Sequence, residues 1–411
     1  MAFTPWMTSD DLIESIKRKI SFPVYQTTFS DQDILDFATE ELMISQVPSV
    51  MQFHEEFFVT TRDVTLKPNK TKYPIPDRAI GMKLRDLFYK DTNGNLFEMT
   101  RIAEDDKAFF QRNMGTYQTI SKYYLEGNDI VLSPDGVQSP TGSLCFVYFL
   151  RPNRLVPNER AAIINCFTKT LTIDNTTLVA GDTFTINDVV FTAVSGSPST
   201  NEFQIGGTSI VTATNLVSAI TISGVITSAN NGSPSTAIIT LCYSDLENTT
   251  FSTTNSDAFE IQVGQGIQFD SIPSNITNGS IIDLLQTKPG HKIRDYDITL
   301  GSNAISGNII NFDEGVIPSD MVIGDYICSQ NECIIPGIPP DLHTALAERT
   351  CARILSAIGD TQGLASTNEK IAEIEQRQGT LLDNRVEGSI KKVRSRHSLL
   401  SLGKMSYRRR W

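Results

Sequence analysis

Hydrophobic positions in the first sixty residues recur at helical spacing. After Thr8 and Asp11, which fit the two ends of a capping box, four apolar residues fall on one helical face: Leu12, Ile13, Ile16 and Ile20. Ser30 and Asp33 repeat the arrangement ahead of a second apolar stripe. Residues 48–57 would form a third helix that begins at a proline, a residue that fits the first turn. The pattern predicts three helices.

From residue 58 the pattern changes to the alternation of strands. Val64 and Leu66 alternate with polar residues, and residues 91–95 carry the Asn-Gly signal of a hairpin. A second hairpin is predicted over 123–132, and the apolar run 144–150 is typical of a buried strand. Helices and antiparallel strands together predict an α+β unit.

The next segment has short alternating runs, such as 184–192, and is rich in Ser, Thr and Asn, which favours small antiparallel sheets. The pentapeptide Gly-Ser-Pro-Ser-Thr occurs at 196–200 and 232–236, each time between strand-like runs, which predicts two similar turns. Thr212 could cap one short helix, and further strands are expected between 298 and 327.

The C-terminal part returns to helices. Asp341 follows two prolines and opens a helix that Gly359 ends. A second helix is predicted over 362–385. Its heptad-like stripe, which indicates packing on a neighbouring subunit, consists of Leu364, Ile371, Ile374 and Leu381.

These patterns predict an α+β protein with helical N- and C-terminal parts, antiparallel β hairpins and an inserted β-rich domain. Four regions follow from them. They are an N-terminal helical and β unit (1–159), the insert (160–287), a β-rich return segment (288–340) and a helical hairpin with a basic tail (341–411).

Charge is distributed very unevenly along the chain. The 411 residues carry 35 Lys and Arg against 47 Asp and Glu, a net charge of −12. Residues 170–287 contain ten acids and neither Lys nor Arg, whereas residues 385–411 carry nine cations and one acid, a net +8 that leaves −20 for the rest. The cations of this tail and its terminal aromatic residue are Arg385, Lys391, Lys392, Arg394, Arg396, Lys404, Arg408, Arg409, Arg410 and Trp411.

So many cations repel one another unless an acidic or phosphate surface receives them. The three arginines before Trp411, residues 408–410, together with this tryptophan have the composition of an interface hot spot, which favours docking on a protein. Such a cluster could equally stack on DNA. A disordered, solubilising tail is the alternative. The acidic net charge disfavours a basic nucleic-acid-binding domain as a description of the whole chain.

Candidate chemistry is sparse. The chain has no phosphate-binding G-x-x-x-x-G-K-[ST], no G-x-G-x-x-G and no H-E-x-x-H, and its four histidines are isolated. Glu55-Glu56 and Asp105-Asp106 are interpreted as solvated acids on helix surfaces. We therefore predict no enzyme activity, no catalytic or metal-binding residue and no cofactor.

The cysteines and the apolar stretches indicate the redox state of the chain and its relation to membranes. None of the six cysteines has C-x-x-C spacing, so we predict reduced, mostly buried thiols; Cys328 and Cys333, five apart, are the pair that could form a disulfide. No stretch reaches the ~20 apolar residues of a membrane span, and the N-terminus lacks the pattern of a secretory signal. A soluble protein without membrane association is expected.

Several segments together resemble the head-to-tail adaptor, or neck ring, proteins of tailed bacteriophages, in particular the ring proteins of short-tailed and crAss-like phages. The segments that carry the resemblance are FSDQDILDFATEEL, YPIPDRAIGMKLRDL, YYLEGNDIVLSP, YFLRPNRLV, IPPDLHTALAERTCARILSAIGD and LLDNRVEGSIKKVRSRHS. The Lys/Arg-free part looks like small β-rich modules of phage tail and neck proteins, here inserted between the two halves of an adaptor.

The resemblance implies a structural virion protein that is assembled in the host cytoplasm. Such adaptors form homo-oligomeric rings, typically dodecamers, beneath the portal protein, where they extend the DNA channel and attach the tail. A C-terminal segment docks on the portal, and further neck ring, tail or fibre proteins are partners. DNA would pass an acidic bore without sequence-specific binding, since like charges do not hold its phosphates.

Two other classes of function stay open. The Ser/Thr/Asn-rich insert could make the chain a receptor- or glycan-binding tail protein, and adhesins of this kind are commonly trimers. An envelope-degrading hydrolase would need convergent carboxylates, which the sequence does not reveal.

Overall fold

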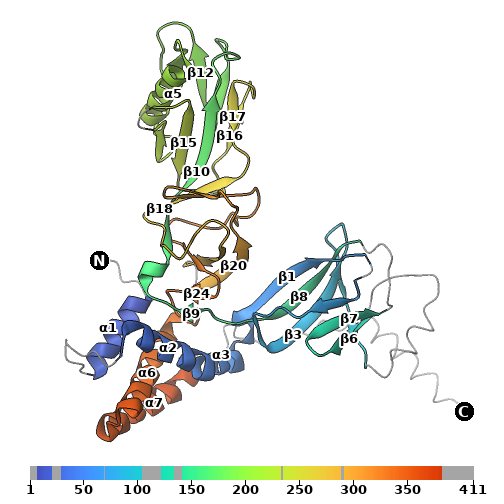
Figure 1. Ribbon diagram of the computed structural model, residues 1–411, viewed down its shortest axis with the longest axis vertical. Helices are drawn as coiled ribbons and strands as arrows, with labels where there is room; N and C mark the ends of the chain where they lie inside the picture. The colour runs from blue at the N-terminus through green and yellow to red at the C-terminus, as the bar shows by residue number, and fades with distance from the viewer. Residues whose placement is uncertain are drawn as a thin grey trace, which may run out of the picture.

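The computed structural model describes residues 7–20, 29–68, 70–103, 122–133, 141–232, 235–287 and 291–381. Three limbs meet near the middle of the molecule (Figure 1): a base of helices, a lateral arm of strands, and an upright limb made of a middle β-module and a tip. Helices lie near both ends of the described chain and antiparallel and mixed sheets lie between them, so the fold is α+β, as predicted. No helix in these ranges is long and apolar enough to cross a membrane.

The helical base joins the two ends of the described chain. Its elements are α1 (Ser9–Ile20), α2 (Asp31–Glu41), the π-turn η1 (Leu42–Gln46), α3 (Val47–Phe53), the 3₁₀ turns η2 (Glu55–Phe58) and η5 (Pro340–Leu342), α6 (His343–Ile358) and α7 (Thr361–Leu381). Helix α6 packs against α1, α2 and α7. Leu12, Leu35, Leu346 and Ile354 are fully buried in the shared core. The N- and C-terminal helices therefore stabilise one another.

Both predicted capping boxes are present. Thr8 N–H donates to the Asp11 carboxylate while Asp11 N–H donates to the Thr8 hydroxyl, and Ser30 and Asp33 form the same reciprocal pair ahead of α2. These local bonds satisfy N–H groups that the first turn leaves without helical acceptors. Two helix starts thus follow directly from the sequence.

The predicted third helix is present as α3, with Pro48 in its first turn, but it ends at Phe53 rather than at residue 57. Elements α2, η1 and α3 form one continuous run that ends at Phe53, and the 3₁₀ turn η2 follows. In the π-turn the Val47 N–H donates to the Leu42 carbonyl, five residues back. This widening makes room for the ring of Pro48 at the next residue, so the proline does not break the helix.

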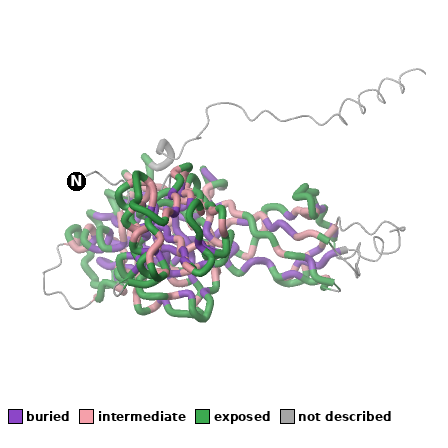
Figure 2. The backbone as a smooth tube through the Cα atoms, turned by 90° about the horizontal axis from the view of Figure 1, so that it is seen from above, coloured by how far each residue is buried: buried purple, intermediate pink, exposed green. Residues whose placement is uncertain are grey.

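The arm consists of two four-stranded sheets that enclose one core. The first sheet has the strand order β1 (Val59–Thr65), β8 (Ser143–Leu150), β3 (Ala79–Lys90) and β4 (Leu96–Glu98). The second has the order β2 (Lys72–Pro74), β7 (Asp129–Ser133), β6 (Lys122–Glu126) and β5 (Thr100–Arg101). Phe146 and Tyr148 of the central strand β8 are fully buried, and Figure 2 shows buried stretches along the length of the arm. Both predicted hairpins and the predicted buried strand are confirmed.

The middle module is built around β10 (Ala162–Ile173), which continues upward into the tip (Figure 1). The lower half of β10 pairs with β18 and β23, and its upper half pairs with β15 and β17. The module's other elements are β9 (Arg154–Leu155), η4 (Asn158–Arg160), β18 (Gln265–Phe269), β19 (Ile281–Gln286), β20 (Lys292–Thr299), β21 (Ile305–Ser306), β22 (Ile309–Phe312), β23 (Tyr326–Ser329) and β24 (Glu332–Cys333). One sheet therefore contains strands of both the predicted insert (160–287) and the predicted return segment (288–340).

The tip has its own core beneath the helix α5 (Ser209–Ser223). Its strands are β11 (Thr183–Ile186), β12 (Val189–Val194), β13 (Glu202–Gln204), β14 (Ser228–Asn230), β15 (Ile238–Tyr243), β16 (Phe251–Thr253) and β17 (Phe259–Ile261). The alternating run 184–192, expected to belong to a small antiparallel sheet, forms the antiparallel pair β11–β12. The two Gly-Ser-Pro-Ser-Thr copies fall between β12 and β13 and between β14 and β15.

The cap of the tip helix was predicted at the wrong threonine. Thr208, in extended conformation, accepts the hydrogen bond of Val211 N–H and begins α5. Thr212 lies one turn inside the helix and is fully buried, where its hydroxyl donates to the Asn175 side chain at 2.7 Å and accepts from Gly206 N–H at 2.8 Å. A tertiary contact, which local pattern does not reveal, thus uses the hydroxyl that was expected to cap.

The prediction that all six cysteines are reduced was also wrong for one pair. Cys166 on β10 and Cys242 on β15 form a disulfide across neighbouring antiparallel strands, with Cα atoms 5.9 Å apart, a normal separation for a bridged pair. The pair is 76 residues apart in sequence, so spacing gave no sign of it. Cys145, Cys328, Cys333 and Cys351 are buried free thiols, and Cys328 and Cys333 do not pair.

Candidate functional site at the helical base and the arm junction

The α6–α7 hairpin carries the predicted subunit-packing stripe. Gly359 adopts a left-handed conformation (φ 84°) that ends α6 and turns the chain into α7. Leu364, Ile371 and Ile374 are half-buried because α7 packs on α6 of the same chain. Leu381 is the last described helical position, and its side chain lies outside the described residues. Packing of this stripe on a neighbouring subunit stays a prediction.

A groove of about 490 Å³ runs beside this hairpin. Its floor is one face of α6 and includes the small residues Ala352, Ser356 and Ala357, while Phe37 of α2 and Ile371 of α7 stand at its walls. Small floor residues allow a further helix to approach closely. The groove is therefore a surface hollow of the base that could receive a helix.

Ion pairs fix the walls of this groove. Arg353 pairs with Glu40 and, at 2.8 Å, with Glu41, which ties α6 to α2. Arg349 pairs with Glu375 of α7 and donates to the Ser45 hydroxyl at 2.8 Å. Both arginines are thus neutralised within the chain, and the groove offers no strong net charge to a partner.

The ten predicted portal-docking residues, from Arg385 to Trp411, lie outside the described residues. They follow α7 in the chain, so the tail begins at the outer helix of the base. Its role in docking remains a prediction that rests on composition.

The second candidate site is the junction where the arm meets the middle module. Asp283 of β19 is fully buried, and Arg78, just before β3, is 6% exposed. The Arg78 guanidinium donates to both Asp283 oxygens at 2.9 and 3.0 Å, and it also donates to the Asn153 side-chain oxygen. Asn153 in turn donates to Asp283 at 2.8 Å. Three residues far apart in sequence thus share one buried polar cluster.

Aromatic and charged groups extend this cluster across the junction. Two arm arginines lie over the ring of Tyr296 on β20, with the guanidinium carbon of Arg78 5.0 Å and that of Arg62 5.4 Å from the ring centroid. Arg62 also pairs with Asp297 at 3.2 Å, and the Tyr296 hydroxyl bonds to that of Tyr148 on β8. Arm and body are therefore joined by charge-assisted and cation–π contacts rather than by apolar packing alone.

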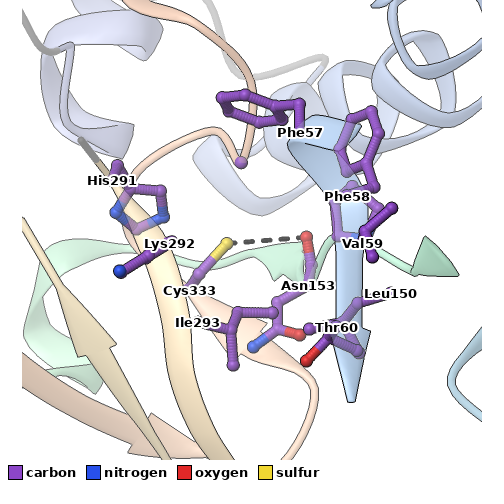
Figure 3. Close-up of a pocket in the computed structure, with 12 residues that line it drawn as sticks. Phe57, Phe58, Val59, Thr60, Leu150, Asn153, His291, Lys292, Ile293 and Cys333 are labelled. Carbon is purple, nitrogen blue, oxygen red and sulfur yellow. Dashed lines mark hydrogen bonds between the residues drawn. The ribbon is translucent and has the colours of Figure 1, made fainter. Parts of the chain in front are cut away.

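A cavity of about 110 Å³ lies beside the cluster (Figure 3). Val59 and Thr60 of the arm line one side, and His291 and Ile293 of the body line the other. Cys333 donates through its thiol to the Asn153 carbonyl at 3.5 Å. The packing between arm and body is incomplete at this point.

The two buried histidines near this cavity are held neutral. Burial lowers the pKa of His291 to about 3, and the nearby His343 ring adds to the effect. Burial lowers the pKa of His343 to about 4. The Nδ1 atom of His343 accepts from Met7 N–H at 3.1 Å and its Nε2 lies 3.3 Å from the Ile338 carbonyl, an arrangement that places the proton on Nε2.

The thiols are unsuited to nucleophilic chemistry. Burial raises the pKa of Cys145 to about 11 and that of Cys351 to about 12, and it raises the pKa values of Cys328 and Cys333 further. Since the thiolate is the nucleophile, these side chains are structural. Among the described residues, no group of three or more His, Cys, Asp or Glu is placed to hold a metal ion.

The tip carries unbalanced negative charge. In the described part of 170–262 its acids form no ion pair; instead Asp174 accepts from Thr176, Glu202 from Ser199 and Asp245 from Asn248. These hydrogen bonds lower the pKa values of the three carboxyls, which therefore stay ionised at neutral pH. The tip is a negative pole far from the base.

The sequence reasoning overlooked the junction cluster. Arg78 and Asn153 fell inside segments noted only for their resemblance to adaptor proteins. One signal for Asp283 was available: it is the single acid within the otherwise apolar run Ile281–Leu285, and a charge in a buried strand demands a partner.

No protein-family model matches this sequence, and no curated protein matches it. The functional conclusion therefore depends on the chain's own charges, surfaces and geometry.

Proposed function

We propose that the chain is a structural virion protein, a head-to-tail adaptor that forms a ring below the portal, extends the DNA channel and attaches the tail. The observation that carries the proposal is the separation of charge: a body of net −20 and a tail of net +8 that follows the outer helix of the base. Such a molecule is suited to docking through its tail on an acidic surface while its body does not bind DNA phosphates.

The base supplies surfaces suited to ring closure. The half-buried stripe on α7 and the groove on α6 lie side by side, because Ile371 belongs to both. A neighbouring copy that covers them would bury the remaining apolar area, and closing the ring would make individually weak contacts collectively firm. The tip would then stand away from the base and contact further tail or fibre proteins.

The first test is the state of assembly. We expect native mass spectrometry and projection images of the purified chain with isolated portal to give a ring, or a portal complex, of about twelve subunits. A lone monomer that neither forms rings nor joins the portal would refute the proposal.

The second test concerns the tail. Removing residues 385–411 should leave a folded chain that no longer joins the portal, and Arg408→Ala, Arg409→Ala and Arg410→Ala together should weaken docking and its dependence on salt. The matched control removes three exposed cations from the arm, through Lys67→Ala, Lys83→Ala and Arg101→Ala. Equal docking by the tail variant and this control would rule out the tail assignment.

A receptor- or glycan-binding tail protein is the second candidate, favoured by the tip. The tip has a core of its own and lies at the end of the upright limb, far from the base. An adhesin would give trimers by mass and would keep its ligand binding after removal of residues 385–411. The adaptor proposal expects rings and loss of portal docking instead.

A further inference from the structure

We infer that the Arg78–Asp283 cluster is a positioning device: it sets one angle between the arm and the body. That this angle also places neighbouring subunits in a closed ring rests on the proposed function. The angle itself is a property of the single chain.

The arm is attached to the body at one end. In the described residues the chain enters it at Val59 and leaves it after Leu150, at the same end, so both covalent links act as a single attachment. The cavity of about 110 Å³ lies at this attachment, between Thr60 and Ile293, so apolar packing does not fill the seam. Apolar contacts also cross the junction, since Ile293 of the body packs against the arm core and Phe149 of the arm packs against the core of the base. These contacts have no fixed direction and leave the cavity open, so we assign the choice of angle to the directional polar contacts.

Asp283 is fully supplied with donors. Besides Arg78 and Asn153, it accepts from the backbone N–H of Asp297 at 3.1 Å and of Asn331 at 3.0 Å. The pairing of β19 with β20 shifts register at Asp283. A buried carboxylate with five donors permits only one arrangement of the groups around it.

The backbone around the cluster is strained in the way expected of a functional site. Asp297 (φ 59°) and Asn331 (φ 64°) adopt left-handed conformations, and both direct their N–H groups to Asp283. Met82, in the irregular part of β3 that follows Arg78, is also left-handed (φ 54°). Such conformations persist only where surrounding contacts enforce them, and they are concentrated at functional sites.

A buried ion pair contributes little net stability, whereas it can select one conformation among several. The geometry makes this selection important here. Strand β3 has 12 residues, so the arm reaches about 40 Å at ~3.3 Å per residue. A tilt of about 10° would move its far end by roughly 7 Å, more than the ~4.8 Å between neighbouring strands.

The test measures the arm angle in the isolated full chain. Spin labels introduced at Thr92, near the far end of the arm, and Ser302, on the body, report one distance by double electron–electron resonance; both positions are exposed. The labels are attached through unnatural amino acids, since the chain has buried thiols. We expect one narrow distance distribution in the wild type.

The decisive variant is Arg78→Met with Asp283→Leu, which removes the cluster without leaving a buried charge. We expect its distance distribution to be at least twice as wide, or to have several maxima. The control is Lys72→Met with Glu126→Leu, which removes an exposed pair 2.8 Å apart within the arm and should leave the distribution narrow. A folded decisive variant with an unchanged, narrow distribution would overturn the inference.

If the double variant does not fold, Arg78→Lys replaces it. Lysine keeps the charge and loses the two-pronged contact, so the distribution should still widen, and an unchanged distribution would again overturn the inference. Projection images separate this inference from the proposed function. A wild-type chain that neither forms rings nor joins the portal would refute the adaptor role and leave the measured angle intact. Regular rings of the widened variant would show instead that the angle does not place subunits.

Discussion

The buried histidines make the stability of this protein depend on pH. With folded pKa values of about 3 for His291 and about 4 for His343, both rings stay neutral in the folded chain at pH 5. In the unfolded chain a histidine titrates near 6.5. Between these values the unfolded state binds more protons, so stability is complete above pH 6.5 and is lost as the pH falls from 6.5 toward 4.

The size of the effect follows from the width of this window. Each pH unit below 6.5 costs about 1.4 kcal/mol per histidine in the free energy of unfolding. At pH 5 the loss is about 2 kcal/mol for His343 alone and about 4 kcal/mol for the two rings together. Since whole domains are stable by only about 5–15 kcal/mol, such a loss is readily measured.

The assay compares urea unfolding at pH 7, 6 and 5 for the wild type, His343→Gln and His54→Gln. The glutamine at 343 does not titrate, so the decrease between pH 7 and pH 5 should shrink by about 2 kcal/mol. His54→Gln is the control for the loss of a buried histidine ring as such, because His54 is also buried and lies in another part of the base, 3.5 Å from the Glu56 carboxylate. The carboxylates are the same in all three proteins, so their contributions to the pH dependence of the free energy of unfolding cancel in the comparison. Identical pH dependence of wild type and His343→Gln would refute the reasoning.

Three substitutions probe the base by urea unfolding. Leu346→Ala removes a fully buried side chain from α6 and should cost about 2–5 kcal/mol; a loss below 1 kcal/mol would mean that the core is not packed there. Ser30→Ala should cost about 1 kcal/mol, since it opens the capping box of α2, and an unchanged midpoint would contradict the role of the box. Gly359→Ala should cost about 1 kcal/mol because its φ is 84°, whereas Gly207→Ala, in open space, should have little effect; equal losses would remove the conformational explanation.

Features of this fold that depend on neighbours in sequence were predictable. The boxes at Thr8 and Ser30, the stop at Gly359 and the hairpin turn at Asn93-Gly94 each need only a few consecutive residues. The same holds for the apolar run 144–150, which forms most of the largely buried strand β8. Local propensity and period therefore suffice for these elements.

The features that were missed depend on contacts between distant residues. Thr212 looks like a cap until Asn175, 37 residues earlier, takes its hydroxyl. Arg78 and Asp283 are 205 residues apart, and the bridged cysteines 76. No spacing rule reports such pairs, because the packing of separate modules creates them. The predicted tail site lies beyond the described residues and remains open to experiment.

The way β10 serves two cores has a consequence for the evolution and engineering of this chain. Thr168 on the outgoing strand lies directly opposite Gly266 on the returning one, so the chain leaves the body and comes back at neighbouring positions. A side chain at 266 would collide with the Thr168 hydroxyl, 2.1 Å from the position of its first carbon, so the seam between the two strands is close-fitting. A few linking residues across that seam would close the sheet below it and release the tip. Tyr243 of β15 is buried in the core of the middle module and Cys242 is bridged to Cys166, so an exchanged tip must supply both residues for the rest of the molecule to keep its shape.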